Sequence, residues 1–343
     1  MLKLKVGFSR NIRVEPLIEG MVKPKNIELQ FVLCNPGELF YRNLKYDEFD
    51  MFEMSFSEYL MTKEKGDGKR WRWNGLPVFL SKAFMWLNLL VNAKAEISDA
   101  RDLRGKRIGV PDYPMTAALW MRKVFKELYG IEHHDIVWYN GRIRELSHAG
   151  ILGLDKSLPQ GVVLNWLTKE QSLDVMLDGG EIDAAFNVPR RGNAGTKDAR
   201  NFDRHGGTLL EGNPMIRRLF PDSGRQVITE FYLRTGVVPV NHIVVVQNRV
   251  LEENPWVALE LYKAFLESKE IAYKAGRNSS ATLLFEGDDL RRQMETFGED
   301  PYPCGLKANR KMLEMLVRSS VEQGLTKGLA RIEDLFYPST WST

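Results

Sequence analysis

One histidine and a set of basic and hydroxyl side chains are the residues whose types and positions could do chemistry. His242 interrupts the apolar stretch Val237–Val246. A titratable group inside an apolar strand is either a core histidine with satisfied hydrogen bonds or an acid–base group of a functional site. The sequence leaves both interpretations open. Among the candidates, His242 is the hardest to dismiss as a residue with a purely structural role.

Most of the other candidates follow short apolar segments. Arginines, hydroxyls and the free N–H groups at a helix start together favour an anion site, most naturally for a carboxylate. Each arginine taken alone could be a solvated surface charge, which is the commoner case, and Ser55 and Thr116 could equally be helix caps. The candidate binding residues are Arg10, Arg13, Ser55, Ser81, Lys82, Tyr113, Thr116 and Arg190.

Motifs of the common cofactor, metal and hydrolytic enzymes are missing. The chain contains no G-x-G-x-x-G after a strand, no G-x-x-x-x-G-K-[ST], no H-E-x-x-H and no G-x-S-x-G. Cys34 and Cys304 have no partners at metal-ligand spacing, so we expect two reduced thiols. We therefore predict no metal site and no nucleophilic catalysis by serine or cysteine.

The elements that would position these residues alternate between short apolar segments and amphipathic ones. This rhythm predicts a mostly parallel sheet with helices on both faces, the α/β class. The expected strands are Leu4–Phe8, Ile27–Leu33, Asp50–Met54, Ile108–Pro111, Ile136–Tyr139, Ile182–Val188 and Val237–Val246, and the expected helices are Arg13–Glu19, Pro36–Leu44, Ser57–Lys65, Thr116–Tyr129, Lys169–Leu177, Pro255–Ala275 and Lys307–Gln323.

Two long apolar stretches, Ala83–Asn92 and Val237–Gln247, bracket the second α/β unit. We interpret them as the strands by which the chain crosses between two lobes and returns. This predicts a discontinuous lobe of residues 1–92 plus 238–343, a second lobe of residues 93–237, and a ligand cleft between them. The Gly-, Asn- and Arg-rich segment Gly192–Gly212 is expected to be a long loop or a mobile flap.

Composition excludes several classes of protein and partner. The chain has 343 residues, with 48 Lys+Arg against 45 Asp+Glu, and this net charge of +3 gives no electrostatic case for nucleic acid. No apolar run approaches the roughly 18 residues of a membrane span, and the first residues lack the apolar core of a signal peptide. We expect a cytoplasmic protein with a small-molecule partner, and a homo-oligomer stays open.

Several segments resemble the 4,5-dihydroxyphthalate decarboxylase family. Residues 109–118 read G-V-P-D-Y-P-M-T-A-A and resemble its G-V-P-E-Y-x-M-T-A-A, and residues 53–59 read E-M-S-F-S-E-Y and resemble its E-M-S-x-S-x-Y. Short motifs of this kind are weak singly, but the ordered set is specific and covers nearly the whole chain. Further matches follow at residues 180–184, 218–222, 235–242, 254–256, 301–310, 322–325 and 333–336.

This resemblance implies a type 2 periplasmic-binding-protein fold, with two α/β lobes, a central cleft and two crossover strands. It also implies a non-oxidative decarboxylase, a carboxy-lyase acting on an aromatic carboxylate without an organic cofactor. Met85 and Trp86 stand where the family pattern has a basic residue and a histidine, and Gly141–Gly161 departs from the pattern as well. A related hydroxylated aryl carboxylate is therefore an alternative to a phthalate.

Decarboxylation of such an acid needs a proton for the ring carbon that bears the carboxylate. We expect His242 to be this proton donor, or the base for the phenol. The predicted clamps for carboxylates are Arg10, Arg13 and Arg190. The alternative is a solute-binding protein of a transport or sensing system, which fold alone does not separate from the enzyme. A weaker third hypothesis is a biosynthetic enzyme that consumes a bound metabolite as its own substrate.

Overall fold

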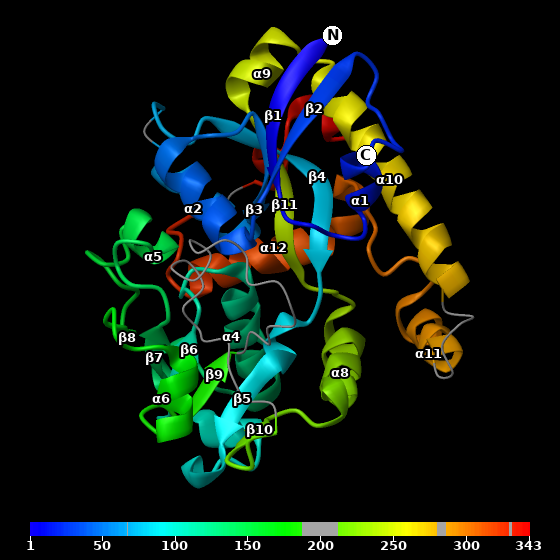
Figure 1. Cartoon of the computed structure of the whole chain (residues 1–343). Helices are drawn as coiled ribbons and strands as arrows, with labels where there is room; N and C mark the ends of the chain where they lie inside the picture. The colour runs from blue at the N-terminus through cyan, green and yellow to red at the C-terminus, as the bar shows by residue number, and fades with distance from the viewer. Residues whose placement is uncertain (67, 187–211, 280–285, 329–330) are drawn as a thin grey trace.

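The strands of the computed structural model form two separate mixed sheets, which confirms the α/β prediction. The structure describes residues 1–66, 68–186, 212–279, 286–328 and 331–343. One sheet lies in the upper half of Figure 1, with both termini, and the other lies below it. The predicted loop Gly192–Gly212 falls almost wholly outside the described residues, so its conformation is not tested.

The upper sheet has five strands in the order β2-β1-β3-β11-β4. β1 pairs in parallel with β2 and β3, while β11 runs antiparallel to both of its neighbours. The carboxyl ends of β1, β3 and β4 therefore share one edge with the amino end of β11. The strands are β1 (Leu2–Phe8), β2 (Ile27–Leu33), β3 (Met51–Ser55), β4 (Trp73–Lys82) and β11 (Val240–Gln247).

Two helices of this half matter most for the shared edge. α2 starts at Pro36, whose missing N–H costs nothing in the first turn, and α3 starts directly after the last residue of β3. The helices of this half are α1 (Glu15–Ile18), α2 (Pro36–Tyr46), α3 (Phe56–Lys65), α9 (Asn248–Glu253), α10 (Val257–Ser279) and α12 (Leu306–Glu322), while α11 (Glu286–Phe297) lies lower in Figure 1.

The lower sheet has six strands in the order β10-β5-β9-β6-β7-β8. The helix expected over Thr116–Tyr129 has these bounds as α4, and Gly130 closes it in the left-handed conformation with φ 66°. The strands are β5 (Leu89–Asn92), β6 (Arg107–Val110), β7 (Val137–Asn140), β8 (Val163–Trp166), β9 (Ala184–Phe186) and β10 (Ile216–Arg218), and the other helices are α5 (His148–Ile151), α6 (Leu173–Gly179) and α8 (Arg225–Thr235).

The chain crosses between the two sheets within Ala83–Asn92 as expected, but it does not do so as one strand. β4 continues to Lys82 and pairs with β11, a 3-10 helix covers Met85–Asn88, and only then does β5 pair with β9 and β10. The chain changes sheets within this stretch, so a single strand would have to keep two incompatible pairings. The predicted lobe boundaries stay a prediction, although β5 pairs in the lower sheet rather than the upper one.

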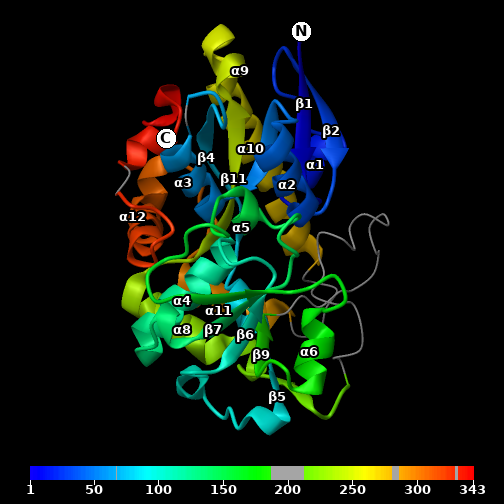
Figure 2. The same cartoon turned by 90° about the vertical axis from the view of Figure 1, so that its left-hand side faces the viewer.

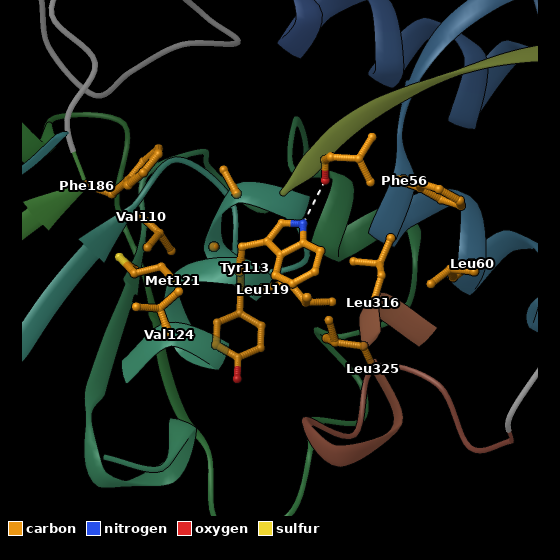
Figure 3. Packing of buried hydrophobic residues seen from close by; sticks show 14 of the residues in the cluster. Phe56, Leu60, Val110, Tyr113, Leu119, Met121, Val124, Phe186, Leu316 and Leu325 are labelled. Carbon is orange, nitrogen blue, oxygen red and sulfur yellow. Dashed lines mark hydrogen bonds between the residues drawn. The ribbon is translucent and has the colours of Figure 1, made fainter. Parts of the chain in front are cut away.

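One hydrophobic cluster joins the two halves of the molecule (Figure 3). It contains Phe56 and Leu316 from the upper half and Val110 and Trp120 from the lower half. The indole Nε1 of Trp120 donates a 2.7 Å hydrogen bond to the carbonyl of Val240 at the start of β11. This contact ties the lower half to the strand that carries His242. Seen from the side in Figure 2, α4 and α5 lie between the two sheets. Among the described residues, no helix is both long and apolar enough to cross a membrane.

Candidate active site

A histidine–carboxylate pair stands at the edge that β1, β3 and β11 share. His242 lies opposite Ser55 in the β3–β11 register and opposite Ser81 in the β4–β11 register. Its Nδ1 is 2.6 Å from Oε1 of Glu53, which lies two residues before Ser55 and on the same face of β3. The carboxylate is 1% exposed and the imidazole 20% exposed, so the pair presents its histidine outward.

Glu53 is held as a carboxylate by its neighbours. Burial, the largest single effect, would raise its pKa, but hydrogen bonds from His242 and Ser9 and the charge of His242 together bring the pKa below the usual glutamate value. Ser9 donates from both its backbone N–H, at 2.9 Å, and its hydroxyl, at 2.5 Å. An ionised Glu53 accepts the Nδ1 hydrogen, which leaves Nε2 of His242 to exchange protons. No hydrogen bond to Nε2 is present within the described part of the chain.

The starts of α3 and α4 meet beside this pair. Oγ of Ser55 and Oγ1 of Thr116 are 2.9 Å apart, and Thr116 Oγ1 also accepts the N–H of Ser57 at 2.9 Å. Only one of the two hydroxyl hydrogens lies between these oxygens. The other has no acceptor among the described residues. Both side chains are almost fully buried and lie at the N-termini of two helices.

An aromatic side chain forms a wall next to the histidine. The ring of Phe40, on α2, meets the ring of His242 edge to face at 5.0 Å between centroids. Phe40 is 4% exposed. Contacts of this kind fix the orientation of both rings.

The structure places the predicted site residues in several different settings. Ser55, Ser81, Thr116 and His242 lie together at the shared edge. Arg10 is exposed and pairs with Glu15 and Glu19, whereas Arg190 lies outside the described residues.

Two other predicted basic residues are engaged by the protein itself. Arg13 donates to the carbonyl of Leu80, and its guanidinium lies over the ring of Tyr302 at 4.5 Å. The Lys82 amine donates to Asn309 at 3.0 Å, and burial lowers the pKa of Lys82 to about 8. Their contact with substrate stays a prediction.

Tyr113 does not lie at the shared edge. Its ring is fully buried against Trp138 and the guanidinium of Arg122, and in Figure 3 it points away from Phe56. The residue follows β6, but its backbone N–H bonds to Asn140, and this turn directs the side chain into the core of the lower half. A position after a strand does not fix the direction of the side chain, and contact of Tyr113 with substrate stays a prediction.

Four residues of the site were not singled out from the sequence as site residues. Glu53 and Ser9 complete the pair with His242, Phe40 forms the wall, and His148 lies on the far side of Phe40 with 6.0 Å between ring centroids. The sequence could have indicated Glu53, because a glutamate within a strand that is expected to be buried needs a hydrogen-bonding or charged partner. Among the described residues, no three His, Cys, Asp or Glu side chains come together as metal ligands would.

Comparison with curated proteins decides the family. The chain is 30% identical to the 4,5-dihydroxyphthalate decarboxylase of Comamonas testosteroni over 342 residues, which is 99% of this chain and 97% of the relative. The chain belongs to the 4,5-dihydroxyphthalate decarboxylase family. A second 4,5-dihydroxyphthalate decarboxylase, from Pseudomonas putida, is 31% identical over 185 residues, or 54% of this chain and 70% of that protein. No family model matches the chain.

Solved structures confirm the expected fold class for this family member. The alkanesulfonate-binding protein SsuA from Xanthomonas axonopodis pv. citri aligns with a TM-score of 0.53 at 13% identity, covering 99% of this chain and 98% of that one. The periplasmic aliphatic sulphonate binding protein SsuA from Escherichia coli aligns with a TM-score of 0.50 at 12% identity over the whole of both chains. The expected periplasmic-binding-protein fold is therefore confirmed. The names of the two curated relatives confirm the expected class of carboxy-lyase.

Proposed function

We propose that this decarboxylase removes CO2 from a hydroxylated aromatic carboxylate, with His242 delivering the proton to the ring. The observation that carries the proposal is the His242–Glu53 pair, in which a buried carboxylate fixes the imidazole and leaves Nε2 outward. The names of the two relatives supply the substrate class, a dihydroxylated benzene dicarboxylate. The closely related alternative is another aryl carboxylate with a hydroxyl para or ortho to the carboxylate.

The proposed chemistry needs one proton and no oxidant. A hydroxyl para to the carboxylate pushes electrons toward the ring carbon that bears it, and the imidazolium of His242 protonates that carbon. The carbon–carboxylate bond then breaks, CO2 leaves, and its electron pair restores the aromatic ring. The product is the same arene with hydrogen in place of the carboxylate, which for the relatives' substrate is a protocatechuate-like acid. Solvent reprotonates His242, and Glu53 balances the imidazolium charge as it forms.

The proposed anchor for the substrate is the junction of α3 and α4. The free hydroxyl hydrogen of the Ser55–Thr116 pair would donate to a carboxylate or phenol oxygen, and the N-terminal dipoles of both helices would favour its negative charge. Phe40 would pack against the flat ring beside His242. Ser81, in register with His242, and Arg190 remain proposed contacts for the remaining polar groups of the substrate.

The proposal is tested by incubation with a panel of hydroxylated benzene mono- and dicarboxylates while CO2 release is followed. Reactions run in D2O should place one deuterium on the ring carbon that lost its carboxylate, which NMR detects. A thermal-shift screen with the same acids runs in parallel, because a ligand that binds only the native state raises stability. Tight binding of these acids without CO2 release would contradict the proposal and support the solute-binding alternative.

A further inference from the structure

The buried imidazole of His148 joins the two halves of the molecule. His148 is the first residue of α5, a helix of the lower half, and its side chain reaches between α2 and α3 of the upper half. Its Nδ1 lies 2.9 Å from Oε1 of Glu58 on α3, and its Nε2 lies 2.8 Å from the carbonyl of Gly37 on α2. Figure 1 shows α5 beside α2. His148 is 1% exposed and Glu58 is fully buried.

The carbonyl of Gly37 fixes the position of one ring hydrogen of His148. A carbonyl only accepts, so Nε2 must carry a hydrogen for Gly37. The second proton sits between Nδ1 and Glu58, either as an imidazolium facing a carboxylate or as a neutral ring facing a carboxylic acid. In both cases the pair is neutral overall and both ring nitrogens are bonded. A buried pair of this kind strongly resists displacement, because separating the groups leaves both of them unpaired.

The turn that carries His148 is itself anchored. The buried carboxylate of Asp112 accepts the backbone N–H of His148 at 2.8 Å and the hydroxyl of Ser147 at 2.8 Å. From the other side, Tyr41 on α2 donates to the carbonyl of Glu145 at 3.3 Å. The turn that carries His148 is therefore held on its own half by Asp112 and is in contact with α2 of the other half.

Phe40 links this junction to the proposed proton donor. It sits on α2 three residues after Gly37, with its ring 6.0 Å from that of His148 and 5.0 Å from that of His242. Phe40 thus lies between two histidine–glutamate pairs, one joining the halves and one at the shared edge. The orientation of the His242 ring depends on where Phe40 stands, and His148 holds the start of the helix that carries it.

From this arrangement we propose that His148 is a positioning residue for the decarboxylation, holding α2 so that Phe40 fixes the imidazole of His242. The inference rests on the proposed function of His242. His148 does not touch the substrate in this account. Its loss should slow proton transfer, and hence kcat, and it should affect substrate binding less.

The test is a double-mutant cycle measured by CO2 release at saturating and limiting substrate. We expect His148→Asn and Phe40→Leu each to lower kcat about tenfold. KM should stay within about threefold in His148→Asn, whereas Phe40→Leu should also raise KM, because Phe40 packs against the substrate ring in the proposed complex. The double variant should be about as slow as either single variant, because both act through the same contact. The matched control is His134→Asn, an exposed histidine of the lower half, which should leave both constants unchanged. Kinetic constants are normalised to the folded fraction measured by thermal unfolding.

A conservative variant separates positioning from simple loss of structure. Glu58→Gln can donate its amide N–H to Nδ1 while Nε2 keeps Gly37, so it should retain kcat within about threefold, whereas Glu58→Leu should behave like His148→Asn. Unchanged kcat in His148→Asn, or independent effects that multiply to about a hundredfold in the double variant, would overturn the inference. If His148→Asn is fully active but His242→Asn is not, only this inference fails. If His242→Asn is also fully active, the proposed function fails with it.

Discussion

Replacing Glu53 with Gln removes the negative charge behind His242 while keeping the shape of the side chain. The carboxylate accepts three hydrogen bonds, two from Ser9 and one from His242. Glutamine has one accepting oxygen and an amide that donates, so at least one of these donors loses its acceptor. The amide also no longer selects the ring form of His242 with hydrogen on Nδ1. Glu53→Gln therefore perturbs the proposed proton donor without opening a cavity.

The expected losses follow from these contacts. A hydrogen bond to a charged group is worth about 1.5–3 kcal/mol of stability. At about 2 °C per kcal/mol, this lowers the Tm by about 3–6 °C. General acid–base catalysis with an oriented histidine contributes about 10²–10⁴-fold. We therefore expect kcat/KM of Glu53→Gln to fall by about 10²–10⁴-fold, which is far more than unfolding of a small fraction of molecules could explain.

The sign of the pH effect on stability is also fixed. The pKa of Glu53 in the folded chain lies below its usual value, so its stabilisation is present above about pH 4.3 and is lost as the pH falls toward the folded pKa. Glu53→Gln should lack this loss. Urea denaturation from pH 3 to pH 7 measures it, as the difference between wild type and variant.

The assay is CO2 release with a matched carboxylate variant. Glu48→Gln is the control, because Glu48 bonds to Arg42 near the opposite end of β3 from the shared edge. The control should lose some stability and keep its kcat/KM. Wild-type kcat/KM in Glu53→Gln, or equal losses in both variants, would refute the reasoning.

Two further substitutions test the neighbouring groups. Thr116→Val removes the acceptor of the Ser57 N–H and the hydroxyl paired with Ser55. We therefore expect the free energy of unfolding in urea to fall by about 1–3 kcal/mol and the KM for the acid to rise. An unchanged KM would count against the proposed anchor. Burial lowers the pKa of Lys82 to about 8, below its value of about 10.4 in the unfolded chain. The charge of Lys82 therefore destabilises the fold at neutral pH, and this penalty disappears as the pH rises from about 8 to about 10.4. Lys82→Met should therefore be more stable relative to wild type at pH 7 than at pH 10, by up to about 3 kcal/mol, and a pH-independent difference would contradict this.

Local sequence patterns predicted the bounds of some regular elements well. The bounds of β2 and α4 agree with the sequence prediction at both ends, because their apolar periods are clear and Gly130 closes the helix. The sequence pattern did not predict the structure of Ala83–Asn92, where the chain passes from one sheet to the other. An apolar run shows that a segment is buried, but it does not show which strand the segment pairs with.

The site was predictable only in part for a related reason. His242 was identifiable because it breaks an apolar strand, but its partner Glu53 lies 189 positions away and meets it only through the antiparallel β3–β11 register. His148 carried no signal, because its partners come from two helices of the other half. The direction of a side chain after a strand, as at Tyr113, depends on the turn that follows. Contacts between distant elements were thus the part that sequence reasoning could not supply.

The central claim is that His242 supplies the proton for loss of CO2 from a hydroxylated aromatic acid. Its most direct test is the single-turnover rate of CO2 release from 4,5-dihydroxyphthalate by wild type and His242→Asn, with binding of the acid measured on the same samples. We predict that the variant folds and binds the acid while its rate falls at least about 10²-fold. A folded His242→Asn variant that releases CO2 at the wild-type rate would contradict the claim.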